Sequence, residues 1–269
     1  MRARPATEDE SRGWDGLLQQ TPGPHLLQSR GWAELKSLTG WRAERYVIED
    51  DTGRQGFAQV LRKRAVPGVE VAYAPRGPLV EPARLPDAIV ALRDALAAER
   101  CASLLCDPEV APDEQVRAEL ARRGVRPSPV FVQPRRTLLI DLAREPEDLL
   151  GAMRKKTRQY IHKAERSGVV TEETRDLDRF LRVLRAVGER DHFALHSREY
   201  FEHLLAAFGD RAHLMLARVG DEDAGALLLA RLGDRAWELY GGWSGTHAED
   251  RRKRARQGTS GGPCVRFGG

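Results

Sequence analysis

Three apolar segments in the last third of the chain place the strongest constraint on its fold. Residues 213–219, 224–232 and 236–240 each have the length and composition of a β-strand, and Gly220-Asp221 and Gly233-Asp234 separate them. Gly-Asp pairs between short apolar segments form the tight turns of β-hairpins. We therefore expect an antiparallel meander, and its apolar face has to be covered by helices or by a second sheet.

The first half of the chain combines elements in a similar way. Residues 42–49 alternate as a strand does, and residues 56–64 form the returning strand after the turn Asp51-Thr52-Gly53. The other expected strands are residues 69–73, 102–106, 137–142 and 169–174, and the expected helices are residues 29–38, 87–100, 112–123, 176–188 and 198–208. Helices combined with largely antiparallel sheets predict an α+β protein. We expect one domain at residues 1–143 and a second at residues 144–250.

The two ends of the chain lack this periodicity. Residues 1–24 are polar and interrupted by proline and glycine, so we expect them to be loosely ordered. From Arg251 the sequence is rich in arginine, glycine and serine, and we expect residues 251–269 to be a disordered tail. This composition is also that of a GC-rich coding sequence read out of frame, so a truncated or frameshifted C-terminus is a further expectation.

The most unusual charge pattern lies just after the middle of the chain. Residues 154–166 contain six Lys or Arg and a single acid, Glu165. Apolar and small residues recur at three- and four-residue steps, which predicts an amphipathic helix with one buried face; they are Leu149, Met153, Thr157, Tyr160, Ile161 and Ala164. Gly168 offers a left-handed C-cap. A solvated face is one interpretation, but the missing acidic partners favour binding to a polyanion.

Composition limits the compartment and the metal chemistry. The net charge is +4, the hydrophobic content is 41%, and only six of the 44 basic residues are Lys. Cys101, Cys106 and Cys264 form no CxxC motif, which indicates neither a disulfide framework nor a zinc site. The sequence has no run of about 18 apolar residues. We expect a cytoplasmic protein without a metal, in contact with the inner face of the membrane only peripherally.

The common catalytic motifs do not match. The sequence lacks a P-loop and a dinucleotide-binding glycine pattern. In Gly242-Trp243-Ser244-Gly245 the second glycine comes one residue too early for a nucleophile elbow, and Phe193 after His192 breaks the HExxH zinc motif. The glycine-rich turn with which acetyltransferases bind acetyl-CoA is also missing. We therefore assign no catalytic residue and expect no cofactor.

Polar residues at strand ends are the candidates for a binding site. Asp107 follows an apolar strand and precedes Pro108, where it either caps the next segment or contacts a substrate. Arg76 lies in a Pro-Arg-Gly-Pro turn, and the fixed backbone of this turn would pre-organise the Arg76 side chain as a cation. Tyr240 is expected at a strand end, where Gly241 and Gly242 would allow a ligand close to the backbone.

These residues belong to a longer series of blocks that runs from residue 26 to about residue 250. The blocks are Leu27-Gln28-Ser29 with Trp32, Lys36 and Gly40-Trp41; Tyr73-Ala74-Pro75-Arg76-Gly77-Pro78; Asp107-Pro108-Glu109; Thr137-Leu138 through Asp141-Leu142; Lys156-Thr157-Arg158 through Lys163-Ala164-Glu165-Arg166; Glu189-Arg190-Asp191; Glu199-Tyr200-Phe201; and Gly233-Asp234 through Leu239-Tyr240-Gly241-Gly242. In this order they resemble the FemABX family, the non-ribosomal peptidyltransferases of bacterial cell-wall synthesis. The Pro-Arg-Gly-Pro and Lys-Thr-Arg blocks are the most specific.

The resemblance implies two acetyltransferase-like (GNAT) domains, of which the second is incomplete at its C-terminal end. Members of the family move an amino acid from aminoacyl-tRNA to an amine on the stem peptide of a peptidoglycan precursor, either UDP-MurNAc-peptide or a lipid-linked form. No acyl-CoA takes part, in agreement with the missing turn. Aminolysis of an ester needs a deprotonated amine, a positioned carbonyl and stabilisation of developing charge.

The resemblance also implies roles for individual residues. Lys36 is expected to contact the diphosphate of the precursor, and Asp107 lies where the family places an acid near the acceptor peptide. Tyr200 and Tyr240 lie at positions of substrate-contacting tyrosines, and Arg76 joins this substrate-binding set. His196 lies near a position that is Arg in some members, where that Arg would make a second phosphate contact. The residues expected to bind tRNA are Arg154, Lys155, Lys156, Arg158, Lys163 and Arg166.

Two other functions are compatible with the residues. A non-catalytic relative would still bind tRNA or precursor through the basic helix. An acyl-CoA N-acyltransferase would act on another amine, although the missing acetyl-CoA turn counts against it. Retained, salt-sensitive tRNA binding without transfer would indicate the non-catalytic relative.

Overall fold

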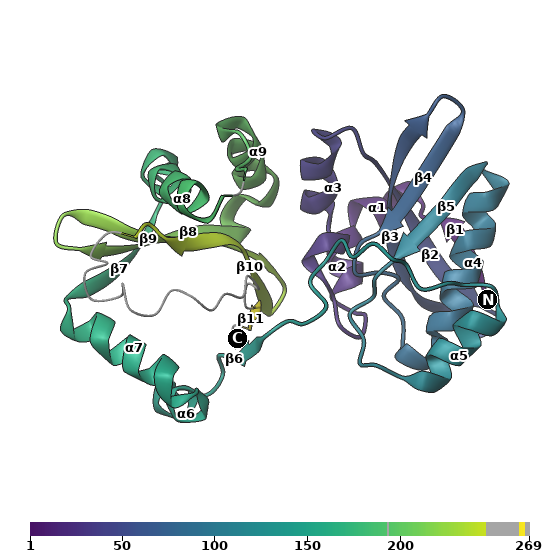
Figure 1. Cartoon of the computed structure of the whole chain (residues 1–269). Helices are drawn as coiled ribbons and strands as arrows, with labels where there is room; N and C mark the ends of the chain where they lie inside the picture. Colours follow the sequence, from purple (N-terminus) through teal and green to yellow (C-terminus); the bar gives the residue numbers. More distant parts are fainter. Residues whose placement is uncertain (193, 246–263, 267–269) are drawn as a thin grey trace. The chain divides into compact units, whose positions relative to one another are not determined.

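The computed structural model describes residues 1–192, 194–245 and 264–266, and the chain divides into two compact units, residues 1–135 and 136–269 (Figure 1). The elements of the first unit are β1 (Arg2–Pro5), α1 (Glu8–Arg12), α2 (Trp14–Leu18), η1 (Leu26–Gln28), α3 (Arg30–Ser37), β2 (Arg42–Asp50), β3 (Gly53–Val66), β4 (Val69–Ala74), η2 (Pro82–Arg84), α4 (Leu85–Ala98), β5 (Cys101–Cys106) and α5 (Glu114–Arg122). The elements of the second unit are β6 (Leu139–Asp141), α6 (Pro146–Ala152), α7 (Lys155–Arg166), β7 (Val169–Thr174), α8 (Leu177–Asp191), α9 (Arg198–Phe208), η3 (Gly209–Arg211), β8 (Ala212–Val219), β9 (Glu222–Leu232), β10 (Arg235–Trp243) and β11 (Cys264–Arg266). Within these described ranges, no helix has the length and hydropathy needed to span a bilayer.

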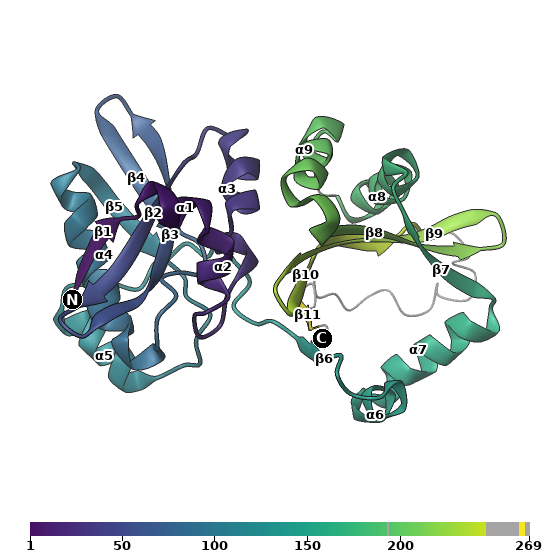
Figure 2. The same ribbon diagram turned by 180° about the vertical axis from the view of Figure 1, so that it is seen from behind.

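The first unit is built on a five-stranded sheet with the order β1-β2-β3-β4-β5. The expected hairpin of residues 42–64 is confirmed, because β3 pairs with β2 in antiparallel fashion over the whole length of β2. Only the last pair, β4 and β5, is parallel, with Tyr73 opposite Leu105 and Ala74 opposite Cys106. Helix α4 covers one face of this sheet, and α1 to α3 lie on the other face (Figures 1 and 2).

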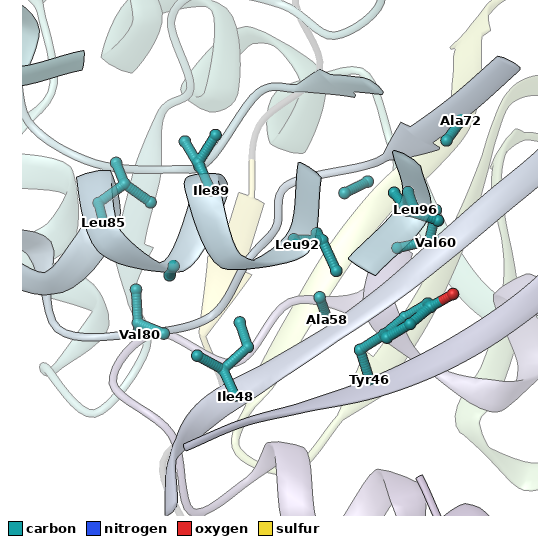
Figure 3. Packing of buried hydrophobic residues seen from close by; sticks show 12 residues of the cluster. Tyr46, Ile48, Ala58, Val60, Ala72, Val80, Leu85, Ile89, Leu92 and Leu96 are labelled. Carbon is teal, nitrogen blue, oxygen red and sulfur yellow. The ribbon is translucent and has the colours of Figure 1, made fainter. Parts of the chain in front are cut away.

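The α4 side of the sheet holds a compact apolar core (Figure 3). Leu85, Ile89, Leu92 and Leu96 recur along α4 at three- and four-residue steps and face the sheet, as expected for an amphipathic helix. The strands contribute alternate residues to the same layer, among them Ile48 and the others that share its face, Tyr46, Ala58, Val60, Ala72 and Ala74. This layer fixes the end of β4 and of β5, where the candidate residues lie.

The N-terminal segment is ordered, so the expectation of a loose start is wrong. Strand β1 pairs with β2, and Thr7 begins α1 with a capping box in which Glu10 takes part. Trp14 is fully buried, its ring meets Phe57 edge-on at 5.3 Å, and its indole Nε1 donates to the carbonyl of Gln28 at 2.8 Å. One large aromatic side chain with a satisfied donor therefore anchors the whole segment to the sheet.

A charged residue lies inside the first unit, and acids surround it. Arg62 on β3 is 4% exposed, and its guanidinium donates to Glu44, Glu70 and Glu99. Hydrogen bonds and attraction from these carboxylates outweigh the cost of burial and raise the pKa of Arg62. The group ties β2, β3 and β4 to the C-terminal end of α4 at the opposite end of the strands from Asp107.

The second unit contains a six-stranded sheet with the order β6-β11-β10-β9-β8-β7. The predicted antiparallel meander is confirmed by the pairing of β8 with β9 and of β9 with β10. Helices α8 and α9 cover one face (Figures 1 and 2). On this face Phe180 and Phe201 are fully buried and contact each other edge-on. The sequence predicts disorder from Arg251 onward, but residues 264–266 form strand β11 and pair with β10. The prediction for the other residues of the tail lies outside the described part of the chain.

The basic helix differs from its prediction in two respects. It does not run continuously from Leu149, because Met153 and Arg154 have extended backbone angles and separate α6 from α7. The side chains of α7 are half-buried or exposed, with Tyr160 38% exposed, so the expected buried face is not formed. The predicted end at Gly168 is confirmed, since this residue has φ +70 directly after the C-cap Ser167.

Candidate functional site

A tight turn after β4 is held by two side chains from elsewhere in the first unit. Arg76, at the centre of this turn, has a φ of +55, a conformation that is rare for a residue other than glycine. Its backbone N–H donates to Asp107 Oδ1 at 2.7 Å. Gln28 is fully buried, and its Nε2 donates to the carbonyl of Pro75 at 2.7 Å. A Cβ on Gly77 would lie 2.7 Å from the Gln28 amide, so the glycine is needed for this close approach.

Asp107 is the centre of the candidate site in the first unit. It follows β5, and its Oδ2 accepts a hydrogen bond of 2.8 Å from the hydroxyl of Tyr73 on β4. Parallel pairing brings the carboxyl ends of β4 and β5 to one edge of the sheet, and this places the two residues side by side. The carboxylate therefore caps the turn at Arg76.

A hollow with a volume of about 360 Å³ opens beside Asp107. One wall is the segment of residues 127–135, which we call the strap. Arg76 Nη2 donates to the carbonyl of Pro134 at 2.8 Å, and Gln133 Nε2 donates to the hydroxyl of Tyr73 at 3.2 Å. Val130, Phe131 and Val132 form the apolar part of this wall, and Ser128 and Arg135 also line it. The hollow thus combines one acid, Asp107, and two guanidinium groups, Arg76 and Arg135, with largely apolar walls.

Burial shifts the pKa of the two titratable groups at the end of β5, Asp107 and Cys106. Burial raises the pKa of Asp107, while hydrogen bonds from the Arg76 N–H and the Tyr73 hydroxyl act in the opposite direction. Burial also raises the pKa of the neighbouring Cys106 thiol, to about 12, so this thiol stays neutral near pH 7. Asp107 is therefore the acid through which this hollow can attract a cationic group.

Lys36 lies in the same unit but does not line the hollow. It is in the last turn of α3, and its Nζ lies 4.6 Å from the centroid of the Trp32 ring. Burial lowers the pKa of this ammonium group, because desolvation disfavours the charged form. An ammonium group can contact a phosphate as a point charge, and this contact stays a prediction for Lys36.

The second unit brings together the three other predicted substrate-binding residues. His196 stacks on Tyr200 with a centroid distance of 3.9 Å, and the hydroxyl of Tyr240 donates to that of Tyr200 at 3.1 Å. Burial raises the pKa of both tyrosines, so both hydroxyls stay protonated. The sequence predicted these residues through family resemblance, and the fold makes them one cluster at the edge of α9 and β10.

The role expected of the glycines beside Tyr240 is wrong. Strand β10 continues to Trp243, so Tyr240 does not end it. A Cβ on Gly242 would lie 2.8 Å from Val187 of α8, and one on Gly241 would lie 2.8 Å from Leu227 of β9. These glycines make room for the protein's own helix and strand, and not for a ligand.

The six predicted tRNA-binding residues all lie in or directly before α7. Arg154, Lys155, Lys156 and Arg166 are exposed, while Arg158 and Lys163 are half-buried. Arg158 donates to the carbonyls of Gly151 and Met153, so it joins α6 to α7 and has a structural role as well. The exposed residues leave a positive surface on one helix, and its only acid, Glu165, is bonded to His162 at 3.1 Å.

Three contributors to the first site were missed as functional residues. Tyr73, Gln133 and Gln28 hold Asp107 and the turn at Arg76, but their partners are distant in the sequence. The sequence signal was the Tyr73-to-Pro78 block itself, in which a strand ends in a proline-rich turn. Among the residues that the structure describes, no cluster of His, Cys, Asp and Glu could hold a metal ion.

Comparison with known proteins decides the family. The FemAB family profile matches residues 11–120 and 128–224, which includes most of both units. This chain belongs to the FemAB family. The match extends over β4, β5 and Asp107 in the first unit and over α7 and α9 in the second.

Individual relatives agree with this assignment. This FemAB family member is 29% identical over 229 residues to the lipid II:glycine glycyltransferases of Staphylococcus aureus strains MRSA252 and USA300, and is homologous to them. The alignment covers 78% of this chain and 54% of each relative, so the chain spans about half the length of these curated relatives. The crystal structure of FemX superimposes with a TM-score of 0.78 and 22% identity, covering 100% of this chain and 89% of FemX, and therefore shares its fold.

Proposed function

We propose that this FemAB family member is an aminoacyltransferase that moves an amino acid from aminoacyl-tRNA to the stem-peptide amine of a peptidoglycan precursor. The family match across both units carries the proposal, together with relatives that are named lipid II:glycine glycyltransferases. The finer description of each unit as a GNAT-like domain belongs to the same proposal.

The hollow beside Asp107 suits the acceptor amine. An amine on an alkyl chain is an ammonium ion near neutral pH, and a half-buried carboxylate attracts it more strongly than an exposed one. The apolar strap residues Val130, Phe131 and Val132 suit the carbon chain that carries the amine. Lys36 would contact the diphosphate of the precursor, and the cluster of His196, Tyr200 and Tyr240 would contact substrate in the second unit.

The chemistry balances without an added reactant. The ammonium ion first loses one proton to solvent and becomes a neutral amine. The amine nitrogen then forms a bond to the ester carbonyl carbon, the bond from that carbon to the tRNA ribose oxygen breaks, and a second proton passes from the nitrogen to this oxygen, which leaves as a hydroxyl. The protein has to hold the two reactants in line and stabilise the oxyanion that develops. The proposal needs no acyl-CoA and no metal.

The exposed cations of α7 suit the phosphates of tRNA. We expect the double variant Lys155→Ala, Lys156→Ala to bind tRNA about tenfold more weakly at 150 mM salt. The variant makes fewer phosphate contacts, so its binding releases fewer counterions from the tRNA. The slope of log K against log salt should become shallower by about one to two units. Fluorescence anisotropy with labelled tRNA over a salt series measures both quantities.

A matched control removes the same charge from another helix. Arg117 and Arg122 on α5 are exposed and pair with Glu114 and Glu119, so their removal should leave the salt slope unchanged. Equal losses in the two double variants would show a response to net charge alone and would remove α7 from the tRNA site.

Binding without transfer is the second candidate function. The positive surface of α7 does not depend on the hollow at Asp107, so a chain could retain tRNA binding and lack catalysis. Salt-sensitive tRNA binding combined with no transfer to any precursor would indicate this alternative.

A further inference from the structure

Tyr73 connects Asp107 to the strap. It lies at the end of β4 and is 8% exposed, so its hydroxyl has few alternatives to partners within the protein. That hydroxyl donates to Asp107 Oδ2 at 2.8 Å and accepts from Gln133 Nε2 at 3.2 Å. A chain of hydrogen bonds therefore runs from the strap, through β4, to the carboxylate at the end of β5.

The Asp107 carboxylate is held at both oxygens. Oδ1 accepts from the Arg76 backbone N–H and Oδ2 accepts from Tyr73, and two such bonds fix the plane of the group. A carboxylate has about four acceptor positions, so lone pairs remain available on the side of the hollow. A free carboxylate would rotate, whereas this one presents those positions in one direction.

We infer that Tyr73 is a positioning residue that sets the orientation and charge of the Asp107 carboxylate, and that Gln133 couples this setting to the strap. The inference rests on the proposed function only for the identity of the group that Asp107 binds. Neither residue is expected to contact the reacting atoms.

The groups around Asp107 explain the expected effect. Arg76 faces it from the turn, Tyr73 from β4, the Cys106 thiol precedes it on β5, and Arg135 lines the hollow from the strap. The Tyr73 hydroxyl donates to the carboxylate and so favours its ionised form. Burial keeps the pKa of Tyr73 above its ordinary value, so the hydroxyl remains a donor at neutral pH.

Gln133 acts on the same bond from the other side. Its amide donates to the Tyr73 oxygen, which polarises the hydroxyl and strengthens its donation to Asp107. Arg76 Nη2 binds the carbonyl of Pro134, the next residue of the strap. A ligand that moves the strap would therefore change the fraction of Asp107 that is ionised, as well as the shape of the hollow.

The test compares Tyr73→Phe with Gln133→Ala and with the control Tyr46→Phe. The Tyr46 hydroxyl also donates to carboxylates, Glu44 and Glu99, but it lies at the other end of the sheet. The Asp107 carboxyl carbon is followed by 13C NMR over a pH titration of the full chain, with Asp107→Asn to assign its signal. We expect the pKa of Asp107 to rise in Tyr73→Phe, to rise less in Gln133→Ala and to stay unchanged in Tyr46→Phe.

Transfer kinetics provide a second readout. On the acid side of the pH profile, Tyr73→Phe should lower kcat/KM by about tenfold, and the loss should shrink as the pH rises and Asp107 ionises again. An unchanged Asp107 titration in a folded Tyr73→Phe protein would overturn the inference, as would an equal loss of kcat/KM at every pH. If the wild-type protein transfers nothing but the titration moves as expected, the proposed function fails and the positioning role stands.

Discussion

Asp107→Asn is expected to lower kcat/KM for the precursor by about 10- to 100-fold, because a charge-assisted hydrogen bond contributes about 1.5–3 kcal/mol and each 1.4 kcal/mol corresponds to tenfold. The loss should appear mainly in the KM for the precursor, while the KM for aminoacyl-tRNA stays the same. Steady-state kinetics with each substrate varied in turn separate the two constants.

Stability distinguishes this effect from unfolding. The pKa of Asp107 is raised by burial, so the native state binds a proton more tightly than the unfolded state does. The stability that this group contributes is present at low pH and is lost as the pH rises through the raised pKa. Asn removes this charge and keeps an acceptor for the Arg76 N–H, so at pH 7 the free energy of unfolding should not fall.

A matched substitution provides the control. Asp113→Asn removes a carboxylate that caps α5 in the same unit, and Asn is itself a good N-cap residue. We expect its transfer kinetics to equal those of the wild type. If Asp107→Asn also retained the wild-type KM for the precursor, the hollow would not be the acceptor site.

Trp14→Ala is expected to lower the free energy of unfolding by about 3–5 kcal/mol, the range measured for large aromatic side chains removed from a core. The variant loses a fully buried ring, an edge-on contact with Phe57 and the hydrogen bond to the Gln28 carbonyl. The last loss matters for the site, because the amide of Gln28 holds the turn at Pro75.

Urea denaturation monitored by circular dichroism measures this change. Trp41→Ala is the matched control, since Trp41 is only half-buried in the same unit and the Lys63 Nζ lies 5.7 Å from its ring centroid. We expect the control to lose less than half as much stability. Equal losses of stability in the two variants would contradict the anchoring role of Trp14 and would favour the loosely ordered N-terminal segment that the sequence predicts.

Sequence periodicity predicted most elements because local patterns determined them. Strands β2 and β3 form a hairpin, and strands β8, β9 and β10 form a meander. In both cases the residues between consecutive strands favour tight turns, which make the strands antiparallel neighbours. The N-terminal segment was missed because its order depends on distant partners. Arg2 and Arg4 of β1 pair with Glu49 of β2, and no local pattern shows this.

The candidate site was predicted in part for the same reason. Asp107, Arg76, Tyr200 and Tyr240 follow from strand ends and from family resemblance, and the structure supplies their neighbours. Tyr73 and Gln133 are 60 residues apart, and they meet only because the strap passes the parallel pair of β4 and β5. The break between α6 and α7 was missed because helical periodicity continues across Met153 and Arg154, whose backbone is extended.

Transfer of a labelled amino acid tests the central proposal most directly. The full chain is incubated with tRNA charged with a mixture of radiolabelled amino acids, together with either lipid II or UDP-MurNAc-pentapeptide. The proposal predicts label on a precursor, dependent on charged tRNA, reduced in Asp107→Asn and unaffected by added acetyl-CoA. Bound tRNA with no label on either precursor, or acetylation of an amine from acetyl-CoA, would contradict it.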